Sequence, residues 1–502
     1  MRAVPGTLSL LLSTSLLAGC AVGPNYVRPT LAAPAAFMGQ AALDQRHAPA
    51  PVEQVADQTA WWRQFDDPVL TRLVGVALDQ NLDLAQSVAR VSQARASLRS
   101  ANAALLPSGN ISAQGTKAHL STQTPLGRLL NADPGFDRNG SLYEANIDAS
   151  WEIDVFGGLR RDQEAARAEY QAAQADVAAA RLAIAAQTAD TYVVIRGLQS
   201  RLKIARDQVQ TQTKLLSTVN YQFGKGVAAE LQVRQAEGAL AETQAGVPML
   251  ENGLEAALNA LDVLLGAQPG TYRAELSAAS PVPIAPTIAN ASGPADLIRR
   301  RPDLVVAERR LAASNAMIGS ALSEYYPKFS LSGLAGTATT ARSGVFDNGA
   351  NQAQGVLGLR WRLFDFGRVG AEVKAAKGRN AEELARYQQA VLQATEDVEN
   401  AFSSLVKRES QEQTLAGGET SLTKARDASL AAYKGGVVSL IEVLDADNRL
   451  LATRDARAQA QTESARAAIA SFRALGGGWD AQAAVVAAGQ GQGATGAPAP
   501  RG

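Results

Sequence analysis

The side chains that perform most enzyme and metal chemistry are scarce in this sequence. Only two of its 502 residues are His and one is Cys, which leaves almost no material for a His/Cys metal site or a thiol enzyme. His47 and His119 have no partner at metal-ligand spacing, so we interpret both as surface residues. The sequence also contains no P-loop and no nucleophile elbow. We therefore expect no catalytic site, no metal and no cofactor.

Carboxylates are the remaining chemical candidates, and they occur in two settings. Asp154 and Asp365 each stand beside a Phe-Gly pair where a strand pattern gives way to a helix, and we interpret them as helix caps. Glu442 and Asp445 are three residues apart in a helical pattern, so they are expected to share one face. An isolated acidic pair is most simply a solvated helix surface. Its role therefore depends on the element that carries it.

The composition indicates what kind of scaffold positions these groups. Lys+Arg and Asp+Glu balance at 48 each, so nothing suggests a nucleic-acid partner. Aromatic residues make up only 5% while alanine is abundant, which favours long helices over compact globular packing. No run of about 20 apolar residues follows the N-terminus, so no transmembrane helix is expected.

The N-terminus has the pattern of a lipoprotein signal. Residues 1–19 carry Arg2, an apolar run and then Leu17-Ala-Gly19, directly before Cys20. This ending is similar to a bacterial lipobox, which implies cleavage before Cys20 and acylation of the new N-terminal cysteine. The alternative is a plain secretory signal with a chance cysteine. Residues 20–60, rich in Pro and Ala, are expected to form an extended segment that leads from the anchor to the body.

One stretch, residues 143–154, alternates between apolar and polar residues without a break. A period of two predicts a strand. Its apolar face comprises Tyr143, Ala145, Ile147, Ala149, Trp151 and Ile153, and its polar face comprises Glu144, Asn146, Asp148, Ser150, Glu152 and Asp154. Two settings fit this pattern: a half-buried strand of a soluble sheet, or an outer-membrane barrel strand with lipid outside and a wet lumen inside.

Long helices are predicted on both sides of this strand. Apolar residues recur at helical spacing from Val69 to about Leu106, and Pro107 ends that helix. From Leu159 a pattern rich in small residues continues for over 100 residues, interrupted by a tight reversal at Phe223-Gly-Lys-Gly226. At about 1.5 Å per residue, the limb before the reversal would reach roughly 100 Å. Such a length suits the crossing of a wide gap.

The second half of the sequence repeats the first. Phe156 and Phe366 are 210 residues apart, whereas Pro107 and Pro327 are 220 apart, so the first hairpin loop is expected to hold the extra residues. We divide the chain into residues 1–19 (signal peptide), 20–60 (lipidated extended segment), 61–267 (first repeat: helix, β-hairpin, long helical hairpin), 268–294 (linker), 295–475 (second repeat) and 476–502 (disordered tail).

Each repeat offers one β-hairpin, so each chain has four predicted strands. In the second repeat Trp361 lies on the apolar face of its strand, and Arg360 and Arg362 lie on the polar face. A strand edge cannot lie bare in hydrocarbon, and the smallest closed membrane barrels need about eight strands. A barrel would therefore be shared between chains: two chains give about eight strands and three give about twelve. The strand count leaves this choice open.

In this order, the motifs resemble those of the outer-membrane factor family, the TolC-like exit ducts of tripartite efflux pumps, and specifically its lipoprotein branch. The resemblance extends from Cys20 to about Leu475. It rests on both Phe-Gly turns and on Cys20-Ala-Val-Gly-Pro-Asn-Tyr26, Trp61-Trp62 with Phe65-Asp-Asp-Pro68, and Arg300-Arg-Pro-Asp-Leu304 with Ala307-Glu-Arg309.

The resemblance implies an α+β membrane protein with an internally duplicated chain. Three chains would share a twelve-stranded transmembrane β-barrel, continued by a long periplasmic α-helical barrel. The implied function is an exit duct in the outer membrane of a Gram-negative bacterium, lipid-anchored and extending into the periplasm, that passively conducts drugs or other small molecules. The implied partners are outer-membrane lipid, a periplasmic adaptor protein and an inner-membrane transporter of the resistance-nodulation-division type.

The resemblance also assigns a site at the helix reversals. In the family, acidic residues just beyond the reversals form a ring around a closed periplasmic gate, and Glu442 and Asp445 match those positions. Gln232 stands where an acid is common in the first repeat, and Val438 stands where some relatives have a gate arginine, so the gate salt bridges of those relatives are not carried over. The glycines of the reversals permit tight turns. The reversals also supply the candidate adaptor contacts, Gly226, Val227, Gly436 and Val437.

Two other functions stay open. A type I protein-secretion duct or a heavy-metal export duct would have the same fold, although the sequence has no Met- or His-rich lumen. A lipid-tethered periplasmic coiled-coil scaffold would need no barrel. The alternating strands with Trp151 and Trp361 argue against this scaffold.

Overall fold

The computed structural model describes residues 21–31, 34–46, 58–288, 293–294 and 300–477. Two compact units are distinguished: unit 1 comprises residues 1–29, 92–172 and 308–386, and unit 2 comprises residues 30–91, 173–307 and 387–502. Both sequence repeats therefore contribute to each unit. Cys20, His47 and the tail after residue 477 lie outside the described residues, as do the signal peptide and its cleavage site.

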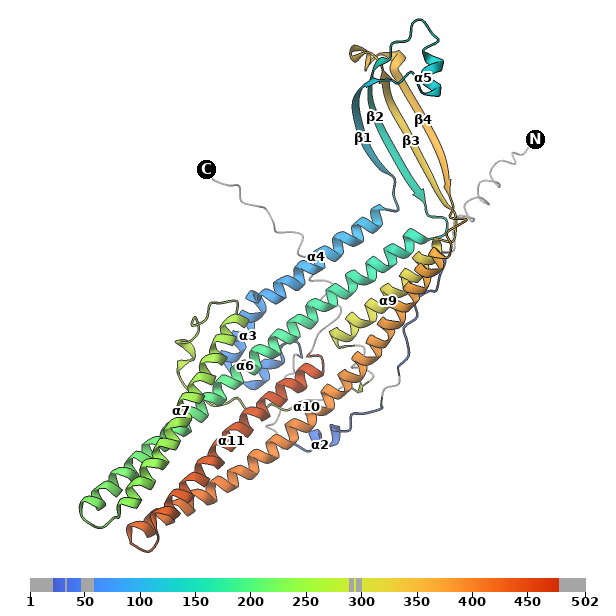
Figure 1. Ribbon diagram of the computed structural model, residues 1–502. Helices are drawn as coiled ribbons and strands as arrows, with labels where there is room; N and C mark the ends of the chain where they lie inside the picture. Colours follow the sequence, from blue (N-terminus) through green and yellow to red (C-terminus); the bar gives the residue numbers. More distant parts are fainter. Residues whose placement is uncertain (1–20, 32–33, 47–57, 289–292, 295–299, 478–502) are drawn as a thin grey trace. The chain divides into compact units, whose positions relative to one another are not determined.

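Each repeat contains a helix, a β-hairpin and then a long helix pair, in the order that the sequence predicts (Figure 1). The helices are α2 (Gln40–Asp44), α3 (Pro68–Gln80), α4 (Leu82–Ala103), α5 (Pro125–Leu130), α6 (Gly158–Gly224), α7 (Glu230–Leu264), α9 (Pro302–Ser323), α10 (Arg368–Lys434) and α11 (Leu440–Ala474). The strands are β1 (Ser108–His119), β2 (Asn139–Ile153), β3 (Lys328–Thr339) and β4 (Asn351–Arg360). Within the described residues, no helix is both long enough and apolar enough to span a membrane.

The four strands of unit 1 form one antiparallel sheet in the order β1-β2-β3-β4 (Figure 1). The β2–β3 ladder joins the two repeats, with Trp151 opposite Leu331 and Ile153 opposite Phe329. The connection from β1 to β2 contains α5 and is longer than the connection from β3 to β4, in agreement with the different repeat offsets. In the part of the chain described, the outer edges of β1 and β4 have no strand partner.

The two faces of this sheet differ as the alternation predicts. On the polar face, Asp148 accepts a hydrogen bond from Ser112 Oγ at 2.8 Å, and Asn146 accepts one from Gln352 Nε2 at 2.8 Å. Large apolar side chains are exposed on the other face: Ile111, Ile147, Leu331, Leu357 and Leu359. A contiguous exposed apolar surface of this kind is typical of a site that contacts a membrane or another protein.

The fourth strand is shorter than expected. The sequence analysis placed Arg360, Trp361 and Arg362 on it, but β4 ends at Arg360. Trp361 and Arg362 therefore follow the strand. Trp361 Nε1 donates to the Tyr325 carbonyl oxygen at 3.0 Å, and Arg362 forms an ion pair with Glu324 at 2.9 Å.

The first helix also differs from the expectation of one continuous element up to about Leu106. It divides at Asn81, whose backbone is extended, into α3 and α4. The Asn81 side chain accepts hydrogen bonds from the amides of Asp83 and Leu84 and donates to the Leu264 carbonyl oxygen at 2.9 Å. An Asn side chain that satisfies the free amides of the next helix makes such a break favourable. The apolar period does not reveal it.

The strand-to-helix junctions confirm the interpretation of both aspartates as caps. Asp154 accepts from the amide of Arg160 at 2.9 Å, and Asp365 accepts from the amide of Val369 at 2.7 Å. Gly157 and Gly367 follow with positive φ values of 80° and 87°. Glycine at these positions allows the chain to turn from strand to helix without steric cost.

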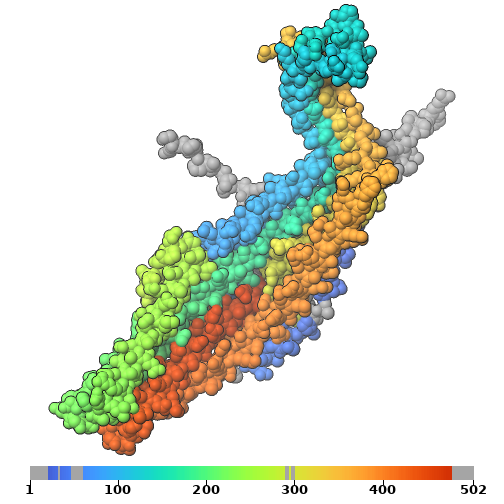
Figure 2. Space-filling model, in the orientation of Figure 1, coloured from blue at the N-terminus to red at the C-terminus, as the bar shows by residue number. Residues whose placement is uncertain are grey.

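Unit 2 contains α7, α11 and the greater part of α6 and α10. α6 and α10 each run for 67 residues, and α7 and α11 each for 35. The ion pairs Arg201–Asp455 and Arg466–Asp190, at 2.7 and 2.8 Å, join α6 to α11. Near the reversals, the surfaces of the two helix pairs lie against each other (Figure 2). Alanine-rich sequences allow such close packing because their side chains add little width.

Candidate functional site

Both helix pairs end in tight reversals of the same design. Gly226 and Gly436 have φ values of 73° and 75°, and each is followed by an exposed valine, Val227 or Val437. The valine amides donate at 2.9 Å to carbonyls five residues earlier, on Gln222 and Ala432. Only glycine adopts this left-handed conformation without strain. The glycines therefore have a clear structural role, and the valines present two apolar side chains to the surroundings.

The acidic pair lies on α11, directly after the second reversal. Glu442 and Asp445 are both exposed, whereas Val443 and Ala446 between and beside them are buried. The two carboxylates thus share the solvent-facing side of the helix, as the spacing predicts. Asp445 forms an ion pair with Arg449 at 2.9 Å, one turn further along the same face.

Gln232 has a local role in the first repeat. Its Oε1 accepts a hydrogen bond from the Ala229 amide at 3.0 Å, which satisfies a free backbone donor at the start of α7. The side chain is partly buried. Val438 is also partly buried and packs against the apolar cluster described next. These two positions, where the family resemblance leads one to look for charged groups, are engaged in capping and packing.

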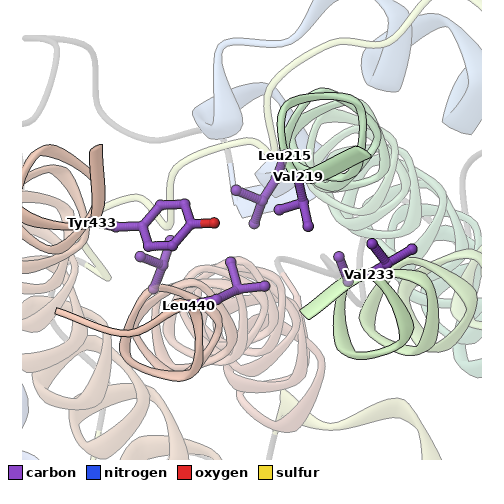
Figure 3. Close-up of a cluster of buried hydrophobic side chains, with 7 residues drawn as sticks. Leu215, Val219, Val233, Tyr433 and Leu440 are labelled. Carbon is purple, nitrogen blue, oxygen red and sulfur yellow. The ribbon is translucent and has the colours of Figure 1, made fainter. Parts of the chain in front are cut away.

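A cluster of buried side chains joins the two helix pairs just above their reversals (Figure 3). We call it the tip cluster, and it comprises Leu215, Val219, Val233, Ala236, Tyr433, Leu440 and Val443. The Tyr433 ring projects from α10 toward α6 (Figure 3), and its hydroxyl group donates a hydrogen bond of 2.8 Å to Gln222 Oε1. Glu442 and Asp445 therefore lie on the exposed face of α11, and the opposite face of α11 packs in a cluster that contains residues of both helix pairs.

The sequence analysis missed a buried ion pair close to the tip cluster. Asp447 is 3% exposed, and its Oδ1 lies 3.0 Å from Arg426 Nε on α10. Burial raises the pKa of the Asp447 carboxyl above its ordinary value, and the Arg426 guanidinium opposes that rise. A signal was present: Leu440, Val443 and Leu450 form a buried stripe in which position 447 falls at helical spacing, so an acid there requires a buried partner.

The strand residues singled out by the sequence lie together in unit 1. Glu144 accepts a hydrogen bond from Gln114, and Glu152 lies 3.9 Å from Lys328 Nζ across the polar face. Tyr143 and Trp151 share the apolar face of β2, with Trp151 Nε1 donating to the Leu105 carbonyl oxygen at 3.0 Å. Arg360 ends β4, and its pairing partner in β3 is Lys328.

The segment that follows Cys20 is seated in unit 1 by a buried arginine. Arg161 is 4% exposed and donates to the carbonyl oxygens of Val22 and Gly23 at 3.1 and 3.2 Å and to Asn25 Oδ1 at 2.9 Å. Gly319 lies beneath this segment, where an added Cβ would come within 2.8 Å of the Val22 oxygen. The residues next to the expected acylation site are therefore held on unit 1 by specific hydrogen bonds.

Comparison with known proteins gives consistent matches over most of the chain. The family model described as outer membrane efflux protein matches residues 73–267 and 293–477, one stretch in each repeat. Nodulation protein T of Rhizobium leguminosarum bv. trifolii is 32% identical, covering 93% of this chain and 96% of its own. The probable outer membrane lipoprotein SilC of Salmonella typhimurium is 30% identical, covering 92% and 97% respectively.

A solved structure supports the same assignment. The outer-membrane channel OprN is 33% identical and superposes with a TM-score of 0.82 over 92% of this chain and 100% of its own. The match confirms the expected fold class, a membrane protein that combines barrel strands with long helices, and places the protein in the outer membrane. Proteins of this family are transport channels. The chain belongs to the outer membrane efflux protein family and is the outer-membrane exit duct of an efflux pump.

Proposed function

We propose that three copies of this chain assemble into one duct that conducts drugs or other small molecules passively and is gated at the helix reversals. The sheet has an exposed apolar face, and among the described residues no strand lies on the outer side of β1 or β4. This observation supports the shared barrel and carries the proposal. Backbone groups on a strand edge must be paired inside a membrane. Three copies give about twelve strands, within the range of closed membrane barrels.

The proposed gate consists of Glu442 and Asp445 from each copy. Both carboxylates are exposed on α11 and close to the second reversal. Three copies would arrange six of them around one axis, where a ring of like charges attracts cations and selects by charge. Gln232 is proposed to line the same aperture from the first repeat, as a neutral residue that also caps α7.

The proposed adaptor contacts are the two reversals, where Gly226 and Gly436 turn the chain and Val227 and Val437 are exposed. The proposed partners, which follow from the family resemblance, are a periplasmic adaptor protein and an inner-membrane transporter of the resistance-nodulation-division type. The proposed anchor is lipid on Cys20, beside the segment seated by Arg161. No other cofactor is proposed.

Native mass spectrometry of the mature protein, extracted from outer membranes in detergent, tests the assembly and the lipid together. We expect a mass three times that of the acylated chain. A monomer released without detergent would overturn the shared barrel and favour the tethered scaffold. A trimer with an unmodified Cys20 would overturn only the lipid anchor.

Single-channel recording in planar bilayers tests the gate. We expect Glu442→Gln with Asp445→Asn to weaken cation selectivity, since the ring loses its charge. Glu242→Gln is the matched control, because Glu242 is an exposed acid on α7 away from the reversals. Equal selectivity in the double variant and the control would exclude the acidic pair as the selective ring.

A further inference from the structure

β2 and β4 are equivalent in the two repeats, yet they end differently. β2 continues through Trp151, Glu152 and Ile153, because these three residues pair with β3 on the side away from β1. Their counterparts, 210 residues later, are Trp361, Arg362 and Leu363. β4 ends before them, and no described strand lies on its outer side. Residues 361–363 are thus the ones that would pair with a further strand on the outer side of β4, as residues 151–153 of β2 pair with β3.

The aromatic residues at the same junctions show a second difference. Phe156 stacks on Tyr326 with ring centroids 4.6 Å apart. The counterpart of Phe156 is Phe366, which is 103% exposed, and the counterpart of Tyr326, 220 residues earlier, is Leu106, which is 64% exposed. Phe366 and Leu106 are therefore the counterparts of the stacked pair, but they lie at opposite edges of the sheet and do not meet within one chain.

The pairings within the chain follow the repeat symmetry. In an antiparallel ladder the residue numbers of two paired residues have a constant sum, which identifies the register. This sum is 258 in the β1–β2 ladder, as for Ser108 and Ser150, and 688 in the β3–β4 ladder, as for Lys328 and Arg360. The difference of 430 equals the two repeat offsets, 210 and 220, taken together. The two hairpins thus have the same register, and the β2–β3 interface becomes a template for the interface between β4 and β1 of different chains.

We propose that β4 of one copy pairs with β1 of the next copy in the register in which partner numbers add to 472. In the β2–β3 ladder they add to 482, as for Trp151 and Leu331; moving β2 forward by 210 and β3 back by 220 gives 472. Trp361 then lies opposite Ile111 and Leu359 opposite Ala113 of the neighbour. Phe366 packs on Leu106 of the neighbour. This inference rests on the proposed shared barrel and specifies how its chains join.

The two edges are chemically suited to this register. Because 472 is even, odd residues meet odd residues, so the apolar Leu357, Leu359 and Trp361 fall on the same face as Ile111 and Ala113. A shift of one residue would place apolar side chains on the polar face of the neighbour. On that polar face, Arg360 and Arg362 approach a hairpin that carries Glu144, Asp148 and Glu152, so the charges are complementary.

Cysteine cross-linking in the full-length membrane protein tests the register. Directly opposed strand residues have Cα atoms about 4.5–5.5 Å apart, within the span of a disulfide. We expect Trp361→Cys with Ile111→Cys to link chains into covalent dimers and trimers on oxidation. Leu359→Cys with Ala113→Cys is a second pair in the same register with a smaller change in volume. Trp151→Cys with Leu331→Cys should link only within one chain and serves as the matched control.

Trp361→Cys with Ala113→Cys tests a register shifted by two residues. Preferential linking of this pair would overturn the proposed register. So would a trimer by native mass spectrometry in which neither register-matched pair links chains, while the shared barrel itself would stand. A protein that forms no oligomer would remove both proposals.

The aromatic contact has its own measurement. We expect the trimer of Phe366→Ala to dissociate several degrees below the wild-type trimer on heated gels. Phe364→Ala is the matched control, because Phe364 is 91% exposed and its counterpart in the first repeat is the polar Asp154. Equal heat resistance of the two variants would overturn the assignment of Phe366 to the interface between chains.

Discussion

Two aspartates near the second reversal have the same chemistry and opposite surroundings. Asp445 is exposed and pairs with Arg449 at the surface, whereas Asp447 is buried and pairs with Arg426 on another helix. The sequence analysis identified Asp445 through family resemblance and overlooked Asp447. A motif identifies residues by position along the chain, but the role of a carboxylate depends on its exposure and its partner, and both depend on the neighbouring helix.

This contrast leads to a prediction about stability. Arg426→Met should lower the free energy of unfolding by about 3–5 kcal/mol, because it leaves the Asp447 carboxylate buried without its partner. Arg449→Met, the matched control, should cost less than about 1 kcal/mol, since the Arg449–Asp445 pair is exposed. Thermal and denaturant unfolding followed by circular dichroism measures both. Equal losses would contradict a buried role for Arg426.

Glu419 gives a prediction about acid stability. Burial acts to raise the pKa of its carboxyl, but hydrogen bonds from Arg457 and Arg454, both at 3.0 Å, outweigh burial and lower the pKa below its ordinary value of 4.5. Since the pKa is lower in the folded state, the stabilisation is fully present above the unfolded-state pKa and is lost as the pH falls through the folded-state pKa.

Glu419→Gln should therefore lower the melting temperature at neutral pH and flatten its decline below pH 4.5. Glu396→Gln, an exposed acid on the same helix α10, should leave the decline unchanged. Melting temperatures measured across the acid range decide between these outcomes. An unchanged slope in Glu419→Gln would show that the two arginines do not stabilise this carboxylate.

At the scale of elements, periodicity predicted the type of each long element and missed its interruptions. The helix pairs, the four strands and both capped junctions follow from spacing and from Asp and Gly at their ends. The break at Asn81 and the end of β4 at Arg360 do not. The first depends on a contact with Leu264, and the second depends on which strand lies alongside, so neither is encoded in the local pattern.

The tip cluster provides the prediction at this scale. Leu440→Ala should destabilise the region around the reversals by about 2–5 kcal/mol, because Leu440 is fully buried between the two helix pairs. Ile441→Ala, at the next position and exposed, should have an effect within about 0.5 kcal/mol. Hydrogen exchange of the amides of α10 and α11 near the reversal reports the local change. Equal exchange in both variants would mean that the cluster does not hold the pairs together.

At the scale of the whole molecule, the duplication was the most informative feature of the sequence. It predicted two equivalent hairpins and two equivalent helix pairs, and the family model matches the chain in two stretches that follow the same division. The number of chains in the assembly has a different origin. Strand count excludes a closed barrel of one chain, but the choice between two and three depends on curvature and contacts between copies, which the spacing of residues along one chain does not specify.

The last prediction concerns how the N-terminal segment is joined to the body. The buried Arg161 makes three hydrogen bonds to residues 22–25, a segment with little secondary structure. Within α6 it also forms an ion pair with Glu164 at 2.7 Å. Losing hydrogen bonds to a charged group costs about 1.5–3 kcal/mol each. Arg161→Met keeps much of the apolar stem and removes these bonds.

We expect Arg161→Met to release this segment, so that limited proteolysis cuts between residues 21 and 31 at least tenfold faster than in the wild-type protein, as a loss of about 1.4 kcal/mol corresponds to a tenfold change in the open population. Arg99→Met, an exposed arginine of the same unit, should leave the cleavage rate unchanged. Cleavage at equal rates in the two variants would show that the seat is formed by the Gly319 surface and by the Tyr26–Glu308 hydrogen bond instead. A selective increase in Arg161→Met would mean that one side chain keeps the residues after Cys20 on the body, and hence limits how far a lipid on that cysteine can move from it.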